Sequence, residues 1–240
     1  MSLFRSFIEQ NRCLICFGVM EASFGWMDFF IPNKKAGVCQ ECQGKLQRVE
    51  GDMCQICGRS FAFLHPQFRS GDYCYDCIRW EENPLYKGIL NRNYSFYLYN
   101  DFLKEIIAKF KYRGDYVLAR VFAEEIAEKI KEIKPEYIIP IPLSEERLSE
   151  RGFNQAEALI VEAGFPAAKI LTRIHSEKQS KKSRNERIHL PQVFQSIQSL
   201  SGKIMIIDDI YTTGSTLRHA AKALKEAGAE EIYSITIARG

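Results

Sequence analysis

Residues 204–216 constrain the fold of this 240-residue chain more than any other segment. An apolar run, 204–207, ends in Asp208 and Asp209, and a short loop then leads into an amphipathic stretch, 217–227. This order predicts a buried strand over 204–208, an acidic corner, a loop and a helix with Gly228 at its C-cap. The loop consists of Thr212, Thr213, Gly214, Ser215 and Thr216.

The chemistry of this segment suits a sugar phosphate. Backbone N–H groups at the start of the helix would face an anion in the loop, and the peptide dipoles favour negative charge there. Asp208 and Asp209 would repel a phosphate, but two carboxylates together can accept hydrogen bonds from the hydroxyls of a diol. Loop and acids together predict a site for a ribose 5-phosphate. The alternative is a strand, turn and helix in which Asp and Thr merely cap the helix.

The same segment resembles the phosphoribosyl pyrophosphate (PRPP) signature of the type I phosphoribosyltransferases, in which two acids and a T-T-G-x-T loop follow an apolar run. The resemblance implies that Asp208, Asp209 and all five residues of 212–216 bind PRPP. It also implies Mg²⁺, bound together with PRPP and bridging the pyrophosphate and the ribose hydroxyls.

Cysteine spacing predicts metal sites, since all eight cysteines fall in four C-x-x-C pairs. Each pair can form a tight turn, or knuckle, and two knuckles supply four thiolates for one tetrahedral ion. The last two pairs have the spacing of a zinc ribbon, and we expect two structural Zn²⁺ sites. Sequential pairing is simpler than a cross-braced arrangement, which the spacing leaves open; disulfides and redox motifs are the alternatives. The expected ligands are Cys13, Cys16, Cys39, Cys42, Cys54, Cys57, Cys74 and Cys77.

The distribution of elements predicts two domains. Residues 1–80 hold every cysteine and few periodic segments, which is typical of a module that folds around its metal ions. From residue 81 onward helices and strands alternate, so we expect an α/β fold: a type I phosphoribosyltransferase-like parallel sheet with helices on both faces over 81–240, preceded by a double zinc-ribbon module. Asp101, Asp115 and Asn154 are the expected caps of three helices. We interpret residues 93–99 as a packed strand in preference to a base-stacking platform.

Composition and net charge exclude few classes of protein. Hydrophobic residues make up 46% of the chain and no apolar run reaches about 18 residues, so we expect a cytoplasmic protein without a transmembrane segment. A net charge of +3 is too small to imply a polyanionic partner, but residues 169–190 form a local basic patch.

Ligands of parallel sheets collect at the carboxyl ends of the strands, so the loop after a strand at 137–141 should face the 208–216 loop. That loop is followed by Arg147 and Arg151, which sit among three glutamates and equally suit a solvated, salt-bridged surface.

Four blocks that follow the C-x-x-C pairs in one order resemble the ComF family of late competence proteins. They are a K-x-x-G-D-like helix end at 111–115, a P-x-P-L...R-G-F-N-Q block at 140–155, a K-Q...R-x-x-R-like segment at 178–187 and the PRPP signature. The resemblance covers almost the whole chain. It implies a role in natural transformation, the import of single-stranded DNA, beside a membrane channel and a DNA helicase. By the same resemblance, pyrophosphate contacts come from the 140–143 loop and from a loop, 178–187, that closes over the site. The expected contact residues are Pro140, Ile141, Pro142, Arg151, Lys178, Arg184 and Arg187.

Three functions therefore remain open. The favoured one is a competence protein with a PRPP-type pocket that handles imported single-stranded DNA, at the inner face of the membrane and in peripheral association with the uptake channel. The second is an active phosphoribosyltransferase with an unidentified base or nucleotide acceptor, and the third is a non-catalytic adaptor for a DNA helicase. The expected DNA contacts are Lys181, Lys182, Arg184 and Arg187.

Overall fold

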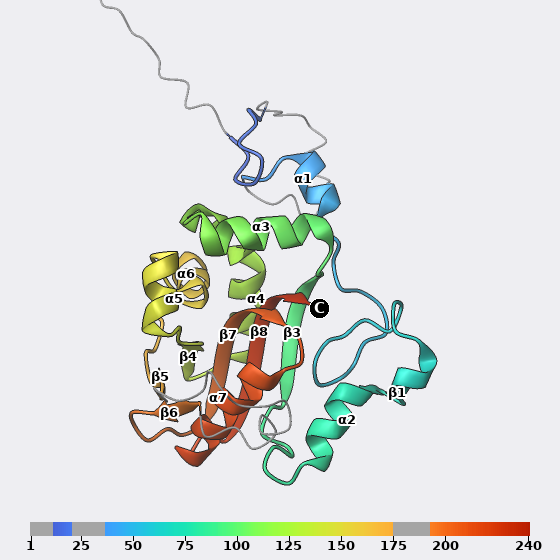
Figure 1. Ribbon diagram of the computed structural model, residues 1–240, viewed down its shortest axis with the longest axis vertical. Helices are drawn as coiled ribbons and strands as arrows, with labels where there is room; N and C mark the ends of the chain where they lie inside the picture. Colours follow the sequence, from blue (N-terminus) through green and yellow to red (C-terminus); the bar gives the residue numbers. More distant parts are fainter. Residues whose placement is uncertain (1–11, 21–36, 175–192) are drawn as a thin grey trace, which may run out of the picture.

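A four-stranded parallel sheet organises the computed structural model, which describes residues 12–20, 37–174 and 193–240 (Figure 1). Every neighbouring pair of strands in this sheet is parallel, as the alternation of helices and strands predicted. In spatial order the strands are β3 (Arg92–Leu98), β8 (Glu231–Arg239), β7 (Lys203–Tyr211) and β4 (Tyr137–Pro140).

Each face of the sheet carries its own apolar core. Successive side chains of a strand point to opposite faces, so the buried run of β7 divides between the two. Met205 and Ile207 belong to the core on one face, together with residues of four helical elements: α3 (Asp101–Tyr112), η3 (Tyr116–Phe122), α4 (Ala123–Ile133) and α6 (Gln155–Glu162). Ile204 and Ile206 belong to the other core, with α7 (Ser215–Glu226). Helices on both faces confirm the predicted fold class.

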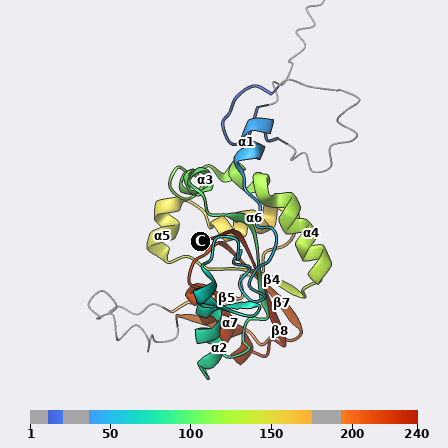
Figure 2. The same ribbon diagram turned by 90° about the vertical axis from the view of Figure 1, so that its right-hand side faces the viewer.

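The cysteine-rich part of the chain contributes to both cores. Cys13 and Cys42 lie in the core with α3, and Cys54 and Cys77 lie in the core with α7. Figures 1 and 2 both place α1 against α3, on the side of α3 away from the sheet. The short elements of this part are α1 (Gln40–Lys45), η2 (Pro66–Phe68), β1 (Arg69–Ser70), β2 (Tyr73–Cys74) and α2 (Tyr75–Glu82). The domain boundary near residue 80 stays a prediction.

The chain between the two cysteine groups covers one edge of the sheet. Val49 N donates to Phe96 O at 2.9 Å and Leu98 N donates to Gln47 O at 2.9 Å, so this segment pairs with β3 in the antiparallel sense. Arg48 then reaches Glu125 of α4 at 2.9 Å. Backbone groups that an edge strand would leave open are thereby satisfied.

Helix starts agree with the sequence at one cap and differ at two. Asn154 caps α6 as predicted, its side chain accepting from the N–H groups of Ala156 and Glu157. α3 is capped by Asn100 and not by Asp101, which occupies the first helical position. Asp115 makes no side-chain cap. The chain after it forms the 3₁₀ helix η3 and then α4, in place of the single helix expected there. Both Asn and Asp favour N-caps, so residue type alone does not decide between neighbours.

Three further observations complete the fold. The interpretation of 93–99 as a packed strand is confirmed, because β3 spans nearly these residues and buries Tyr97. The strands β5 (Leu171–Arg173) and β6 (Phe194–Ser196) form an antiparallel pair beside α7. Helix α5 (Glu145–Arg151) precedes α6.

Among the described residues, no helix has both the length and the apolar character needed to cross a bilayer.

Candidate functional site

The two acids of the PRPP-like segment lie inside β7. The strand was predicted to end at residue 208, but it continues to Tyr211, because β8 supplies hydrogen-bonding partners as far as Arg239. Asp208 and Asp209 are therefore held on a paired strand near the carboxyl end of the sheet, and Asp209 N donates to Asp208 Oδ1 at 2.9 Å. Asp209 is buried, and the carboxyl group of Asp208 is buried although the residue as a whole keeps some exposed surface.

Cations from other elements surround these carboxylates. Lys111, at the end of α3, forms an ion pair with Asp209 at 2.6 Å, and both side chains are largely buried. Burial, and after it the charge of Asp209, raise the pKa of Asp208 to about 7, against the opposing influence of Lys111 and Arg151. Burial and then repulsion from Arg147 lower the pKa of Arg173, while Asp208 acts in the opposite direction. The acid pair thus lies in a predominantly positive environment.

The loop after β4 lies beside the acids, as predicted. Pro140 pairs with Ile207 in register, and Ile141 N donates to Ile207 O at 3.0 Å, one residue before Asp208. Asn154 Nδ2 donates to Ile141 O at 2.9 Å and so ties this loop to the start of α6. Pro142 follows directly, partly exposed. The carboxyl ends of β4 and β7 therefore meet at one site.

Arg151 and Arg147 differ in their surroundings. Arg151 is half-buried, donates to Gln155 Oε1 at 2.9 Å, and has a buried Nε without a hydrogen-bond partner among the described residues. Its guanidinium lies 5.7 Å from the centroid of the Tyr112 ring. Arg147 is exposed. A solvated surface describes Arg147, whereas Arg151 faces the interior of the site.

The 212–216 segment starts α7, and the only side-chain hydrogen bond that the described residues make to its first turn runs from Ser215 N to Thr213 Oγ1 at 3.4 Å. Gly214 is the N-cap, with φ of 78°, and makes no side-chain cap, whereas α3, α5 and α6 are capped by Asn100, Ser144 and Asn154. A Cβ at position 214 would collide with Tyr211 Oη and Arg218 Nη1, so both backbone angle and space require glycine here. The first-turn amides of α7 are suitably placed for an anion.

Two residues outside every predicted motif hold this segment. Trp80 Nε1 donates to Thr213 O at 2.9 Å, and Arg239 Nη1 donates to Thr212 O at 2.8 Å. Neither residue belongs to a motif, and Trp80 is 133 positions away from its acceptor. The sequence offered one indication that distant residues contact this segment: Arg218 is a charged residue within the apolar stripe of the α7 pattern. In the structure Arg218 is fully buried.

Five predicted site residues lie outside the described part of the chain. They are Lys178, Lys181, Lys182, Arg184 and Arg187. The described residues on either side of this segment lead into the paired β5 and β6.

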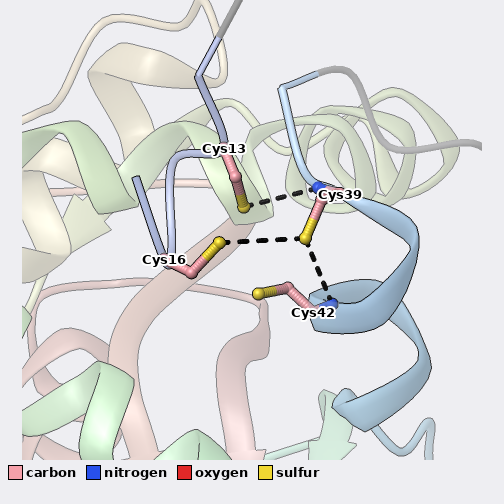
Figure 3. A group of neighbouring side chains, drawn as sticks. All are labelled: Cys13, Cys16, Cys39 and Cys42. Atoms are coloured by element: carbon pink, nitrogen blue, oxygen red, sulfur yellow. Dashed lines mark hydrogen bonds between the residues drawn. The ribbon is translucent and has the colours of Figure 1, made fainter. Parts of the chain in front are cut away.

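The cysteines form two groups of four, each with all Sγ atoms within 4.8 Å of one another. The pairing is sequential: the first cysteine cluster is Cys13, Cys16, Cys39 and Cys42, and the second cysteine cluster is Cys54, Cys57, Cys74 and Cys77. In Figure 3 the four sulfurs of the first cysteine cluster converge on one small volume between the N-terminal knuckle and the start of α1.

The sulfur geometry of both clusters fits a tetrahedral metal ion and not a disulfide. Sγ–Sγ distances are 3.8 Å for Cys16 and Cys39 and 3.6 Å for Cys57 and Cys74, far beyond a bond of about 2.05 Å. Four ligands about 2.3 Å from a central Zn²⁺ would be separated by roughly these distances. Cys39 N donates to Cys13 Sγ and Cys74 N donates to Cys54 Sγ, both at 3.4 Å, which favours the thiolate form.

Asp208→Asn should reduce the pH dependence of the free energy of unfolding. The pKa of the native carboxyl is about 7, above its ordinary value of 3.8, so its stabilising contribution is complete below pH 4 and is lost as the pH rises towards 7. The variant is neutral throughout, so relative to wild type it should gain on the order of 1–2 kcal/mol between pH 5 and pH 8 in urea unfolding. Exposed Asp101→Asn is the control, and a variant that parallels wild type at both pH values contradicts this account.

Comparison with known proteins agrees with this geometry. Residues 118–240 match the family model described as "Phosphoribosyl transferase domain". This match includes β4, β7, β8 and α7, the elements that carry the acids and the 212–216 segment.

Relatives that match over nearly all of this chain are competence proteins. The chain is 36% identical to competence protein ComFC of Bacillus subtilis, over 97% of this chain and 96% of the relative. It is 31% identical to competence protein ComFC of Streptococcus pneumoniae, over 95% and 100%. It is 26% identical to competence protein F of Haemophilus influenzae, over 95% and 96%. The chain belongs to the ComF family of competence proteins, with a phosphoribosyl transferase domain as its C-terminal part.

Proposed function

We propose that the carboxyl ends of β4 and β7 form a PRPP pocket, and that the protein uses it while handling imported single-stranded DNA. One observation carries the first part: two carboxylates, an uncapped helix N-terminus and several cations surround one end of β7. Membership of the competence family supports the second part.

Each part of the ligand has a matching group. The ribose hydroxyls would donate to Asp208 and Asp209, which only accept hydrogen bonds when ionised. The 5-phosphate would accept from the amides at the start of α7, and the pyrophosphate would lie along the 140–142 loop near Arg151. Lys111 already compensates one charge of the acid pair, so the site can hold a polyanion without leaving two repelling carboxylates uncompensated.

An active phosphoribosyltransferase is the second candidate, favoured by the presence of acids, loop and cations together. Mg²⁺ bound with PRPP would neutralise charge on the leaving pyrophosphate. The residues of this chain would hold the ribose while positive charge develops at its reacting carbon, and no protein nucleophile is required. Pyrophosphate release measured against a panel of bases distinguishes a transferase from a binding pocket.

Asp208→Asn and Asp209→Asn should each weaken PRPP binding about tenfold to a hundredfold, because each removes a charge-assisted acceptor worth roughly 1.5–3 kcal/mol. Thr213→Val removes only a hydroxyl and keeps the backbone, so its effect should be smaller. Calorimetry with PRPP and Mg²⁺ measures all three, with Asp101→Asn as the control for a lost surface charge. Absence of binding to wild type at millimolar PRPP would favour the third candidate, an adaptor for a DNA helicase with a relic pocket.

Single-stranded DNA binding should depend on the basic segment that includes Lys181, Lys182, Arg184 and Arg187. Phosphate contacts release counterions, so affinity should fall with salt, and alanine at all four positions should flatten the slope of log K against log salt. A matched quadruple variant removes four exposed cations elsewhere: Lys87, Lys104, Lys131 and Lys134. If only the matched variant changes the slope, DNA follows a different surface.

Zinc is the metal that the two cysteine clusters suit best, since both offer four thiolates at tetrahedral spacing. Metal analysis of protein prepared without chelators should return two zinc ions per chain, and Cys16→Ser should leave one at the second cysteine cluster. Cys16 is the exposed ligand, so its replacement is the least disruptive. One equivalent or none in wild type would refute this assignment.

A further inference from the structure

Arg218 is a buried arginine that touches both the second cysteine cluster and the end of β7. None of its surface is exposed. Its Nη2 donates to Cys77 Sγ at 3.8 Å, and its Nη1 donates to the Tyr211 hydroxyl. Gly214, the N-cap of α7, lies so close to these two groups that a side chain there would strike both. One side chain therefore connects the cluster to the 212–216 segment.

The charge of Arg218 requires an anion that the cluster can provide. Burying a guanidinium is costly unless negative charge and hydrogen-bond acceptors compensate it. Glu81 Oε1 lies 4.0 Å away, at the limit of an ion pair, and Arg218 Nε has no hydrogen-bond partner among the described residues. A divalent ion held by four thiolates carries a net charge of about −2, whereas four protonated thiols carry none. Metal loading thus supplies the counter-charge for Arg218.

Trp80 makes a second connection from the same cluster. Cys77 lies in α2, and Trp80 follows three positions later, on the same side of the helix. Its indole N–H donates to Thr213 O at 2.9 Å, while the Arg218 guanidinium lies 5.1 Å from the ring centroid. Displacement of α2 after metal loss would therefore move Trp80 away from the 212–216 segment.

We propose that the metal-loaded second cysteine cluster positions the 212–216 segment, with Arg218 and Trp80 as positioning residues, so that loss of the metal ion weakens ligand binding at the start of α7. The ligand in this statement rests on the proposed function, whereas the order of the segment does not. The first cysteine cluster packs on the opposite face of the sheet and serves as the internal control.

Hydrogen exchange in the full chain tests the positioning without any ligand. Cys77→Ser should raise amide exchange in residues 211–217, and Cys42→Ser, in the first cysteine cluster, should leave it unchanged. Trp80→Phe keeps every thiol, so it should retain two zinc ions and still raise exchange in the same residues. Its matched control is Tyr86→Phe, which removes a hydroxyl bonded to His219 in the same aromatic group. Unchanged exchange in both Cys77→Ser and Trp80→Phe would overturn the proposal, as would an equal rise in Cys42→Ser.

Measurements of ligand binding are the second test of the proposal. Loss of one hydrogen bond in Trp80→Phe should weaken PRPP binding about fivefold, with wild-type zinc content. Because coupling between two sites is reciprocal, PRPP with Mg²⁺ should raise the zinc-selective chelator concentration needed to empty the second cysteine cluster, and Arg218→Gln should abolish that increase while Arg218→Lys keeps part of it. An identical chelator requirement with and without bound PRPP would overturn the coupling. If wild type binds no PRPP, the proposed function fails, and the exchange measurement alone decides the positioning.

Discussion

The structure depends on cysteines built into the apolar cores on both faces of one sheet: all four of the second cysteine cluster on one face, and Cys13 and Cys42 of the first on the other. Thiolates cannot be buried in such a core without a cation, and a metal ion cannot be held without the two knuckles that converge on it. Metal binding is consequently a condition for packing against the sheet. The requirement is stricter at the second cysteine cluster, where all four cysteines are buried, than at the first, where Cys16 reaches solvent.

The candidate site combines groups that would be unfavourable alone. Asp208 and Asp209 repel each other, and the pKa of Asp208 records that repulsion together with burial. Lys111, near the end of α3, and Arg151, at the end of α5, offset it. Because the cations come from segments distant in sequence from β7 and α7, the site forms only when these elements have packed together. Its charges are therefore organised before any ligand arrives, which lowers the reorganisation that binding requires.

Local patterns predicted the strand with its two acids, the cap at Asn154, the sequential cysteine groups and the neighbouring β4 and β7 loops. Those features depend on residues close in sequence or on a general rule for parallel sheets. Choosing Asp101 over Asn100 failed because both are good caps and tertiary packing decides between them. Trp80 and Arg218 could not be assigned, because their partners lie 133 and 141 positions away and no periodicity encodes such pairs.

The position of β3 bears on how the chain folds during synthesis. β3 lies between the 47–49 segment and β8, and its register with β8 joins Arg92 to Tyr233, near the end of the chain. Such non-local parallel pairing closes a long loop and is slow. The cysteine clusters can take up metal as soon as their knuckles leave the ribosome, but β3 stays without its sheet partner until β8 has been synthesised. The N-terminal third therefore binds its metal ions early and packs against the sheet last.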